Sequence, residues 1–156
     1  MSVIVYNSIN NSNFERLYRT LEGELPDEYL EKFDTIRGFS ERICHMNRGK
    51  LILIIVPYDM EDFNRLFSIK KNLNDIRIIL VLPDRSAKIV SAGYKLRPRF
   101  ISYADSDFYD VTTVIKRMMK LIENNPETVE QFGWKTLSGI WDGNKDEDGI
   151  GYGNRN

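Results

Sequence analysis

The chain of 156 residues has a single cysteine, Cys44, and a single histidine, His45. One cysteine excludes an intramolecular disulfide bond and fits a reducing compartment, so we expect a cytoplasmic protein. Because Cys44 and His45 are neighbours, they would point to different faces of a helix, and no CxxC or HxxxH spacing accompanies them. The sequence therefore predicts neither a metal site nor a thiol site at this pair.

Motifs that bind phosphate or carry out hydrolysis are also missing. The sequence has no Walker A, GxGxxG, HExxH or GxSxG segment, and six of its ten glycines lie after residue 132. An alternating acidic stretch near the end lacks the spacing of Gly and Glu that a calcium loop needs. We therefore predict no catalytic residues, no cofactor and no metal ion.

Long hydrophobic runs and a strong charge of one sign are absent too. No apolar run approaches the roughly 20 residues of a membrane-spanning helix, and the first residues lack the basic segment of a signal peptide. The net charge of −1 argues against nucleic-acid or membrane binding through charge. The charge is uneven, since residues 1–125 carry +2 and residues 126–156 carry −3. We expect neither a membrane nor a nucleic acid as partner.

Three apolar runs stand between residues 50 and 125, and segments with helical periodicity separate them. The runs cover 51–56, 76–82 and 100–103, and the first two are rich in β-branched residues. Near-continuous apolar runs of this kind are typical of strands buried on both faces of a parallel sheet. We therefore predict an α/β fold, a three-layer doubly wound sheet of five parallel strands with right-handed crossovers.

Local signals place the remaining elements. Strands are expected at 3–6, 35–39, 51–56, 76–82 and 99–103. Helical segments are expected at 14–21, 27–33, 40–47, 61–73, 86–94 and 107–124. The first helix is expected to have Ser12 or Asn13 as its N-cap, and the fourth Asp59.

The composition changes near residue 125. We predict one domain over residues 1–125 and a C-terminal extension over 126–156, ordered to about residue 141 and weakly ordered after it. The extension contains aromatic residues that are too apolar for a free linker. We expect them to dock on this domain or on a partner; they include Phe132, Trp134 and Trp141.

Residues 1–125 resemble the receiver domain of two-component response regulators. The resemblance rests on the runs 51–56 and 76–82, each followed by a proline, and on Ser91-Ala92-Gly93-Tyr94, which leads into Phe100-Ile101. It implies the receiver topology, which is a flavodoxin-like layout, and a role in signal transduction.

The resemblance also implies where phosphorylation chemistry would lie. Receivers use an aspartate at the end of strand three, an acidic pair after strand one for Mg²⁺, a Ser or Thr after strand four and a Lys after strand five. In this chain the corresponding positions carry uncharged side chains, namely Asn7, Ser8, Pro57, Tyr58, Leu82 and Tyr103. The resemblance therefore implies a pseudo-receiver, which keeps the fold, lacks the phosphoacceptor site and acts by protein–protein contact.

Two other interpretations stay open. Asp59 is the acid nearest to the end of the third predicted strand, so the chain is a phosphorylatable receiver if Asp59 is a displaced phosphoacceptor rather than an N-cap. Alternatively, the chain is a flavodoxin-like small-ligand-binding protein, with the ligand over Asn7, Tyr58 and Tyr103.

Charged side chains gather on the part of the sequence that receivers use to dimerise. In the receiver layout, the fourth helix, the fifth strand and the fifth helix form one face. We expect this face to contact a histidine kinase, an output protein, a clock-type partner or a second copy in a homodimer; a solvated face is the other interpretation. The candidate residues are Lys88, Lys95, Arg97, Arg99, Asp105, Lys116, Arg117 and Lys120.

Overall fold

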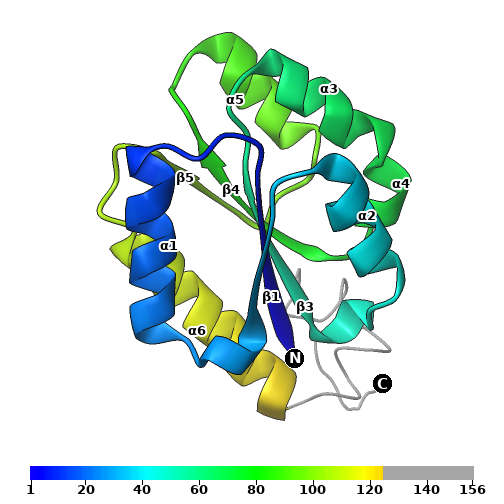
Figure 1. Ribbon diagram of the computed structural model, residues 1–156, viewed down its shortest axis with the longest axis vertical. Coiled ribbons are helices and arrows are strands. Elements are labelled where there is room, and N and C mark those ends of the chain that lie inside the picture. The colour runs from blue at the N-terminus through cyan, green and yellow to red at the C-terminus, as the bar shows by residue number, and fades with distance from the viewer. Residues whose placement is uncertain (125–156) are drawn as a thin grey trace, which may run out of the picture. The chain divides into compact units, whose positions relative to one another are not determined.

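A computed structural model of the chain describes residues 1–124 (Figure 1). The sequence predictions for the extension, which are its order up to about residue 141 and the docking of Phe132, Trp134 and Trp141, lie outside the described residues.

Five strands form one sheet in the order β2-β1-β3-β4-β5, and every neighbouring pair is parallel. The strands are β1 (Ser2–Asn7), β2 (Leu30–Phe33), β3 (Leu51–Val56), β4 (Arg77–Leu82) and β5 (Phe100–Tyr103). The predicted fold class, a doubly wound parallel α/β sheet of the flavodoxin-like kind, is confirmed.

Helices cover both faces of the sheet (Figure 1). One face carries α1 (Ser12–Glu24) and α6 (Tyr109–Asn124). The other carries α2 (Ile36–Cys44), α3 (Met60–Ser68), α4 (Lys70–Leu73) and α5 (Ala87–Tyr94). Short 3₁₀ helices at Asp27–Tyr29 and Arg48–Lys50 precede β2 and β3.

The core has two halves because successive side chains of a strand point to opposite faces. One half joins alternate residues of β1, β3 and β4 to α2, α3 and α5, for example Ile4, Leu53 and Leu80 with Phe39 and Phe63. The intervening strand residues, Val3, Val5, Ile52, Ile54, Ile79 and Val81, are also buried. Burial on both faces explains why these runs are apolar almost without interruption.

The second predicted strand is wrong. Residues 35–39 do not form a strand, because Thr35 is the N-cap of α2 and its Oγ1 accepts a hydrogen bond from Gly38 N at 3.1 Å. The strand β2 lies at Leu30–Phe33, inside the segment predicted as a helix over 27–33. As an edge strand with half-exposed residues, β2 tolerates the polar pair Glu31 and Lys32, and this composition hides it from a search for apolar runs.

The helix boundaries also differ from the prediction in places. Asn11 caps α1, rather than Ser12 or Asn13, and its side chain accepts from Phe14 N at 2.9 Å. The helix predicted over 61–73 is divided into α3 and α4 at Ile69, where ψ is 18°. Asp59 is the N-cap of α3, as predicted.

Two helical glycines differ in the space around them. A Cβ on Gly93 of α5 would lie 3.2 Å from Leu80 Cδ1 and 3.3 Å from Leu82 Cδ2, so glycine allows this helix to approach the sheet closely. A Cβ on Gly23 of α1 would meet no atom within 4 Å.

These surroundings predict opposite effects for the same substitution. Gly23→Ala should raise the free energy of unfolding by about 0.5 kcal/mol, because alanine is the better helix former and nothing obstructs it. Gly93→Ala should lower it by about 1 kcal/mol, because overpacking against Leu80 and Leu82 outweighs the helix preference. Urea unfolding of the two variants measures both values. A stabilised Gly93→Ala protein would contradict the close approach of α5.

Candidate functional site

A cavity of about 160 Å³ lies at the carboxyl ends of the strands. Its walls come from α1 and from the segments at or after the ends of β1, β3, β4 and β5. The described residues that line it are Ile9, Asn11, Asn13, Phe14, Leu17, Val56, Pro57, Tyr58, Val81, Pro83, Ala104 and Phe108. None of them is charged and only Asn11 and Asn13 have polar side chains apart from the hydroxyl of Tyr58, so this end of the sheet presents a mostly apolar recess where open parallel sheets bind their ligands.

Two large apolar side chains of the lining are open to solvent. Tyr58 is 51% exposed and Ile9 is 44% exposed, whereas Phe14 and Phe108 are buried. Large apolar side chains therefore lie both inside the recess and at its opening, where a second molecule can reach them.

Asn7 adjoins the recess with an unsatisfied acceptor. It is the last residue of β1 and pairs in register with Val56, and its Nδ2 donates to Ile9 O at 3.1 Å. Both of these neighbours line the cavity. The Oδ1 atom of Asn7 is buried and has no hydrogen-bond partner, an arrangement that costs free energy unless a donor is supplied.

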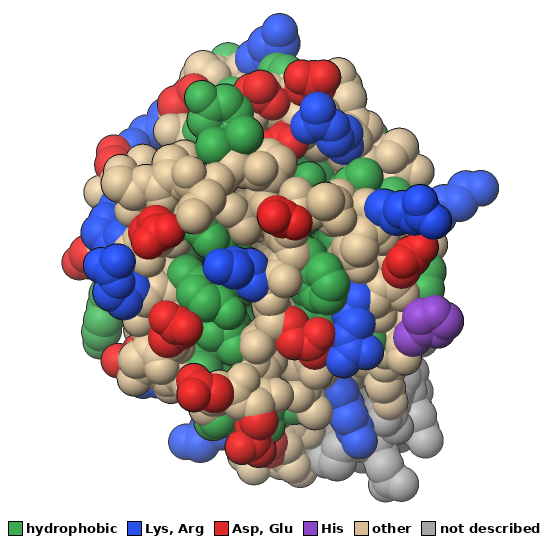
Figure 2. Space-filling view, viewed as in Figure 1, with side chains coloured by type: hydrophobic (Ala, Val, Ile, Leu, Met, Phe, Trp, Pro, Cys, Tyr) green, Lys and Arg blue, Asp and Glu red, His purple; other side chains and the backbone are tan. Residues whose placement is uncertain are grey.

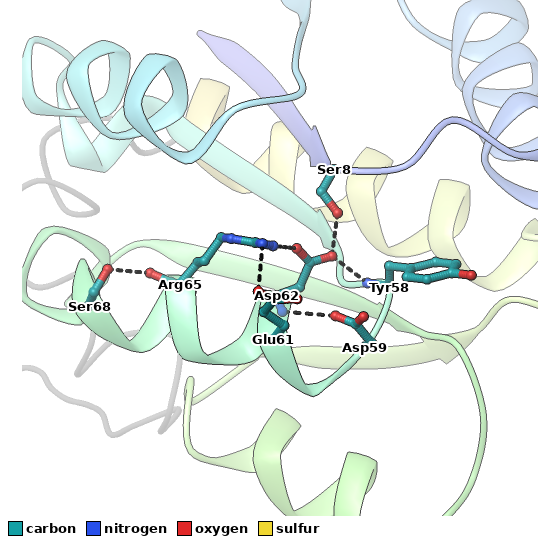
Figure 3. A network of polar contacts seen from close by, with 7 residues as sticks. All are labelled: Ser8, Tyr58, Asp59, Glu61, Asp62, Arg65 and Ser68. Carbon is teal, nitrogen blue, oxygen red and sulfur yellow. Dashed lines mark hydrogen bonds and ion pairs between the residues drawn. The ribbon is translucent and has the colours of Figure 1, made fainter.

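A buried carboxylate beside the recess is held by three donors (Figure 3). Asp62 is 1% exposed, and its Oδ2 accepts from Ser8 Oγ and, at 2.8 Å, from Tyr58 N. Its Oδ1 accepts from Arg65 Nη1 at 2.7 Å. Both oxygens are engaged, and the contacts tie the segments after β1 and β3 to the first turn of α3.

The first turn of α3 explains how the sequence positions this carboxylate. Asp59 caps the helix and its Oδ1 accepts from Asp62 N at 3.0 Å. Asp62 stands three residues after the cap and reaches back to Tyr58 N, one residue before the cap. This resembles a capping box, in which the side chains of the cap residue and of the third helical residue each accept a hydrogen bond from the backbone N–H of the other. Asp62 is not among the residues predicted from the sequence, although the Asp-x-x-Asp spacing of Asp59 and Asp62 is a signal for it.

Tyr6 lies on the other side of β1, in the core half formed with α2, α3 and α5. It is 1% exposed, and its ring stacks on Phe39 with centroids 5.0 Å apart. Burial, with the nearby charge of Asp62, raises the pKa of Tyr6 to about 12. The phenol therefore stays neutral throughout the physiological range.

Two arginines hold the segment after β5. Arg16 of α1 donates to Ala104 O at 2.8 Å and to Ser106 O, and its guanidinium lies 4.5 Å from the ring centroid of Phe108. Phe108 has a φ of 63°, a left-handed conformation that an ordinary residue keeps only when its surroundings enforce it. Arg16 thus fixes the wall of the recess that Ala104 and Phe108 provide. Arg16 is not among the residues predicted from the sequence.

The second arginine, Arg85, lies over Tyr103. Its guanidinium is 4.1 Å from the Tyr103 ring centroid and donates to Asp105 Oδ2 at 2.8 Å. The hydrogen bond from Arg85 lowers the pKa of Asp105 below its usual value. This cation at the end of β5 is therefore already engaged within the chain.

The structure divides the residues that the sequence analysis placed in a degenerate pocket. Pro57 and Tyr58 line the recess, and Asn7 and Ser8 adjoin it through Val56 and Asp62. Leu82 and Tyr103 instead belong to the core half on the opposite face of the sheet. The period of two along each strand accounts for the separation, because Val81 rather than Leu82 faces the recess.

The charged residues of the predicted interaction face are exposed, but some already have partners. Lys116 of α6 pairs with Glu24 of α1, and Asp105 pairs with Arg85. The other members, Lys88, Lys95, Arg97, Arg99, Arg117 and Lys120, are exposed on or beside α5, β5 and α6. Their role in contact with a partner stays a prediction.

Figure 2 shows one face of the molecule, on which Lys and Arg side chains are interspersed with Asp and Glu. Hydrophobic side chains lie between the charges on this face. Such a mixture produces no strong field of one sign.

Among residues 1–124, no three His, Cys, Asp or Glu side chains converge as a metal site would require. The same residues contain no helix with the length and apolar character needed to cross a membrane. Comparison of the chain with protein-family models, curated proteins and solved structures finds no match.

The network around Asp62 predicts an unequal effect of removing neighbouring carboxylates. Asp62→Ala should lower the free energy of unfolding by about 3 kcal/mol, since it leaves Ser8 Oγ and Tyr58 N without their acceptor and removes one of the two carboxylates that pair with Arg65. Asp59→Ala should cost about 1 kcal/mol as the loss of an N-cap. Urea unfolding gives both values.

Glu61→Gln is the matched control for Asp62→Ala, because Glu61 pairs with the same Arg65 through a side chain that is 73% exposed. It should change the stability by less than about 0.5 kcal/mol. Equal losses of stability for Asp62→Ala and Glu61→Gln would show that burial of the Asp62 carboxylate does not increase its contribution to the free energy of unfolding.

The raised pKa of Tyr6 predicts a loss of stability at alkaline pH. The folded state holds the phenolic proton more tightly than the unfolded state, in which the pKa is near 10.0. The contribution of Tyr6 is therefore complete below pH 10 and disappears as the pH rises through about 12, amounting to about 3 kcal/mol. Between about pH 9 and pH 12, the wild type should lose that much more stability than Tyr6→Phe in urea unfolding. Parallel pH curves for the two proteins would contradict this environment for Tyr6.

Proposed function

We propose that the protein is a non-catalytic signalling module of the pseudo-receiver kind, which binds an apolar side chain of a protein partner in the recess at the carboxyl edge of its sheet. The partner is a histidine kinase, an output protein or a second copy of the chain. The proposal rests above all on the size and lining of the recess.

The volume of the recess suits one side chain. A cavity of about 150 Å³ lined by aliphatic and aromatic residues holds one benzene molecule, and this recess measures about 160 Å³. Sites for cofactor-sized or drug-sized ligands occupy roughly 300–1,000 Å³. The recess therefore matches a single Leu, Met or Phe side chain and is too small for a flavin or a nucleotide.

The rim of the recess has the character of a protein contact. Tyr58 and Ile9 expose about half of their surface beside the opening. Exposed aromatic and aliphatic side chains around a pocket are typical of interface centres, where an anchor residue of the partner is buried and water is excluded.

The carboxylates near the recess favour a role that needs no phosphorylation. Asp59 accepts the hydrogen bond that caps α3, and both oxygens of Asp62 accept hydrogen bonds from the chain. Receiver chemistry needs a free carboxylate nucleophile and further carboxylates for Mg²⁺. In this site either role would require the chain to give up contacts that stabilise α3.

One observation favours a second candidate, a free ligand of about one ring. The buried Oδ1 of Asn7 lacks a donor beside the recess, so a small aromatic molecule with an N–H or O–H group would satisfy both the volume and this acceptor. Native mass spectrometry of the protein as purified separates the two candidates, since a bound molecule of one fixed mass supports only the second.

Peptides selected for binding to the full-length protein from a random library test the proposed contact. We expect them to share one large apolar residue. Tyr58→Ala should weaken their binding at least tenfold, or about 1.4 kcal/mol, because it removes the aromatic rim of the recess.

Tyr94→Ala is the matched control, because Tyr94 is also exposed, at 65%, but lies on α5. It should leave the affinity unchanged. If Tyr94→Ala abolishes binding and Tyr58→Ala does not, the contact lies on the face formed by α5, β5 and α6, and the recess is not the binding site.

A further inference from the structure

A buried arginine lies at the opposite edge of the sheet, where β4 begins. Arg77 is 3% exposed, and its Nη1 donates to Gly49 O at 3.2 Å. The other two guanidinium nitrogens, Nε and Nη2, are buried and have no hydrogen-bond partner. Buried polar atoms are rarely left unpaired, and a charged group without partners is the costliest case.

The two unpaired nitrogens form one edge of the guanidinium group. The N–H bonds of Nε and Nη2 point the same way, so they can donate in parallel to two oxygens of a single group. This fork matches the spacing of the oxygens in a carboxylate or a phosphoryl group, and such pairs are among the strongest hydrogen bonds in proteins.

The electrostatic surroundings of the Arg77 guanidinium also favour binding of an anion. Among residues 1–124, no carboxylate acts as a hydrogen-bond acceptor for its guanidinium. Burial lowers the pKa of Arg77 to about 10, and the like charge of Arg99 lowers it as well. The group remains a cation at neutral pH, next to a second cation, and no carboxylate of the described residues forms a hydrogen bond with it.

We infer that the Nε–Nη2 edge of Arg77 is a binding site for a small free oxyanion, a carboxylate or phosphate, which accepts both hydrogen bonds at once. Because Arg77 is almost fully buried, the anion must be small and must enter as neighbouring side chains move aside. The site is separate from the apolar recess, which lies at the other end of the strands. This inference therefore does not depend on the proposed function.

Nitrogen-edited NMR of the arginine Nε–Hε signals in the full-length protein tests this site directly. Sodium phosphate and sodium acetate are titrated separately at constant ionic strength, with chloride as the replaced anion. The Arg77 signal should shift saturably with at least one of the two. At about ten times the Kd, roughly a tenth of the sites remain free, so exchange of this proton with water should slow roughly tenfold.

Arg37 provides the internal control, because it is exposed and already paired with Glu41 at 3.2 Å. Its signal should stay in place. An Arg77 signal that does not move with either anion overturns the proposal.

Thermal unfolding of Arg77→Met gives a second, independent readout. In chloride the variant should unfold at a higher temperature than the wild type, because it removes a buried cation with two unpaired donors. The anion that shifts the Arg77 signal, phosphate or acetate, should then raise the unfolding temperature of the wild type more than that of the variant, beyond any general effect of the salt on protein stability. Equal responses of the two proteins to both phosphate and acetate would contradict the site, and the NMR titration decides the question if the variant does not fold.

Discussion

Burial of both faces of the parallel sheet is the constraint on which the rest of the structure depends. Helices on each side leave β1, β3 and β4 with almost no exposed side chain. Side chains that meet other molecules must therefore lie on helix surfaces or at the two ends of the strands. The unusual features of this chain are found at those ends: an apolar recess at the carboxyl edge and a cation with free donors at the amino edge.

The carboxyl edge of this flavodoxin-like sheet uses its carboxylates to stabilise the chain itself. Asp59 and Asp62 serve the first turn of α3, and Asp62 also holds the segments that carry Ser8 and Tyr58. Arg16 supports the opposite wall through Ala104 and Phe108. Charged groups therefore shape the recess from outside, while the surface that lines it is uncharged and mostly apolar. This division lets a site rich in hydrogen bonds present a mostly hydrophobic surface to solvent.

The sequence predicts the buried part of this fold well and its edges poorly. The run 51–56 is recovered residue for residue as β3, because burial on both faces allows only apolar side chains there. The edge strand β2 is missed, since Glu31 and Lys32 are compatible with a helix and only pairing with β1 makes them a strand. Propensity is overridden here by tertiary context.

For the candidate site, too, the sequence does not predict features that depend on tertiary contacts. The sequence predicts that the residues at the ends of strands one and three, such as Ser8 and Tyr58, lie together, because the carboxyl ends of parallel strands meet. It does not reveal that Leu82 and Tyr103 point to the other face, which depends on the exact register of β4 and β5. Nor does it show that Arg16 reaches a loop 88 residues away in the chain, since such a contact leaves no local pattern.

The central claim is that the carboxyl edge accepts an apolar group and not a phosphoryl group. The most direct test is an amide shift map of the full-length protein, titrated separately with toluene and with beryllofluoride plus Mg²⁺. The account predicts saturable shifts with toluene at Ile9, Phe14, Tyr58 and Phe108 and none with beryllofluoride. Saturable beryllofluoride shifts around Asn7 and Asp59, with no response to toluene, would contradict it and show a working phosphorylation site.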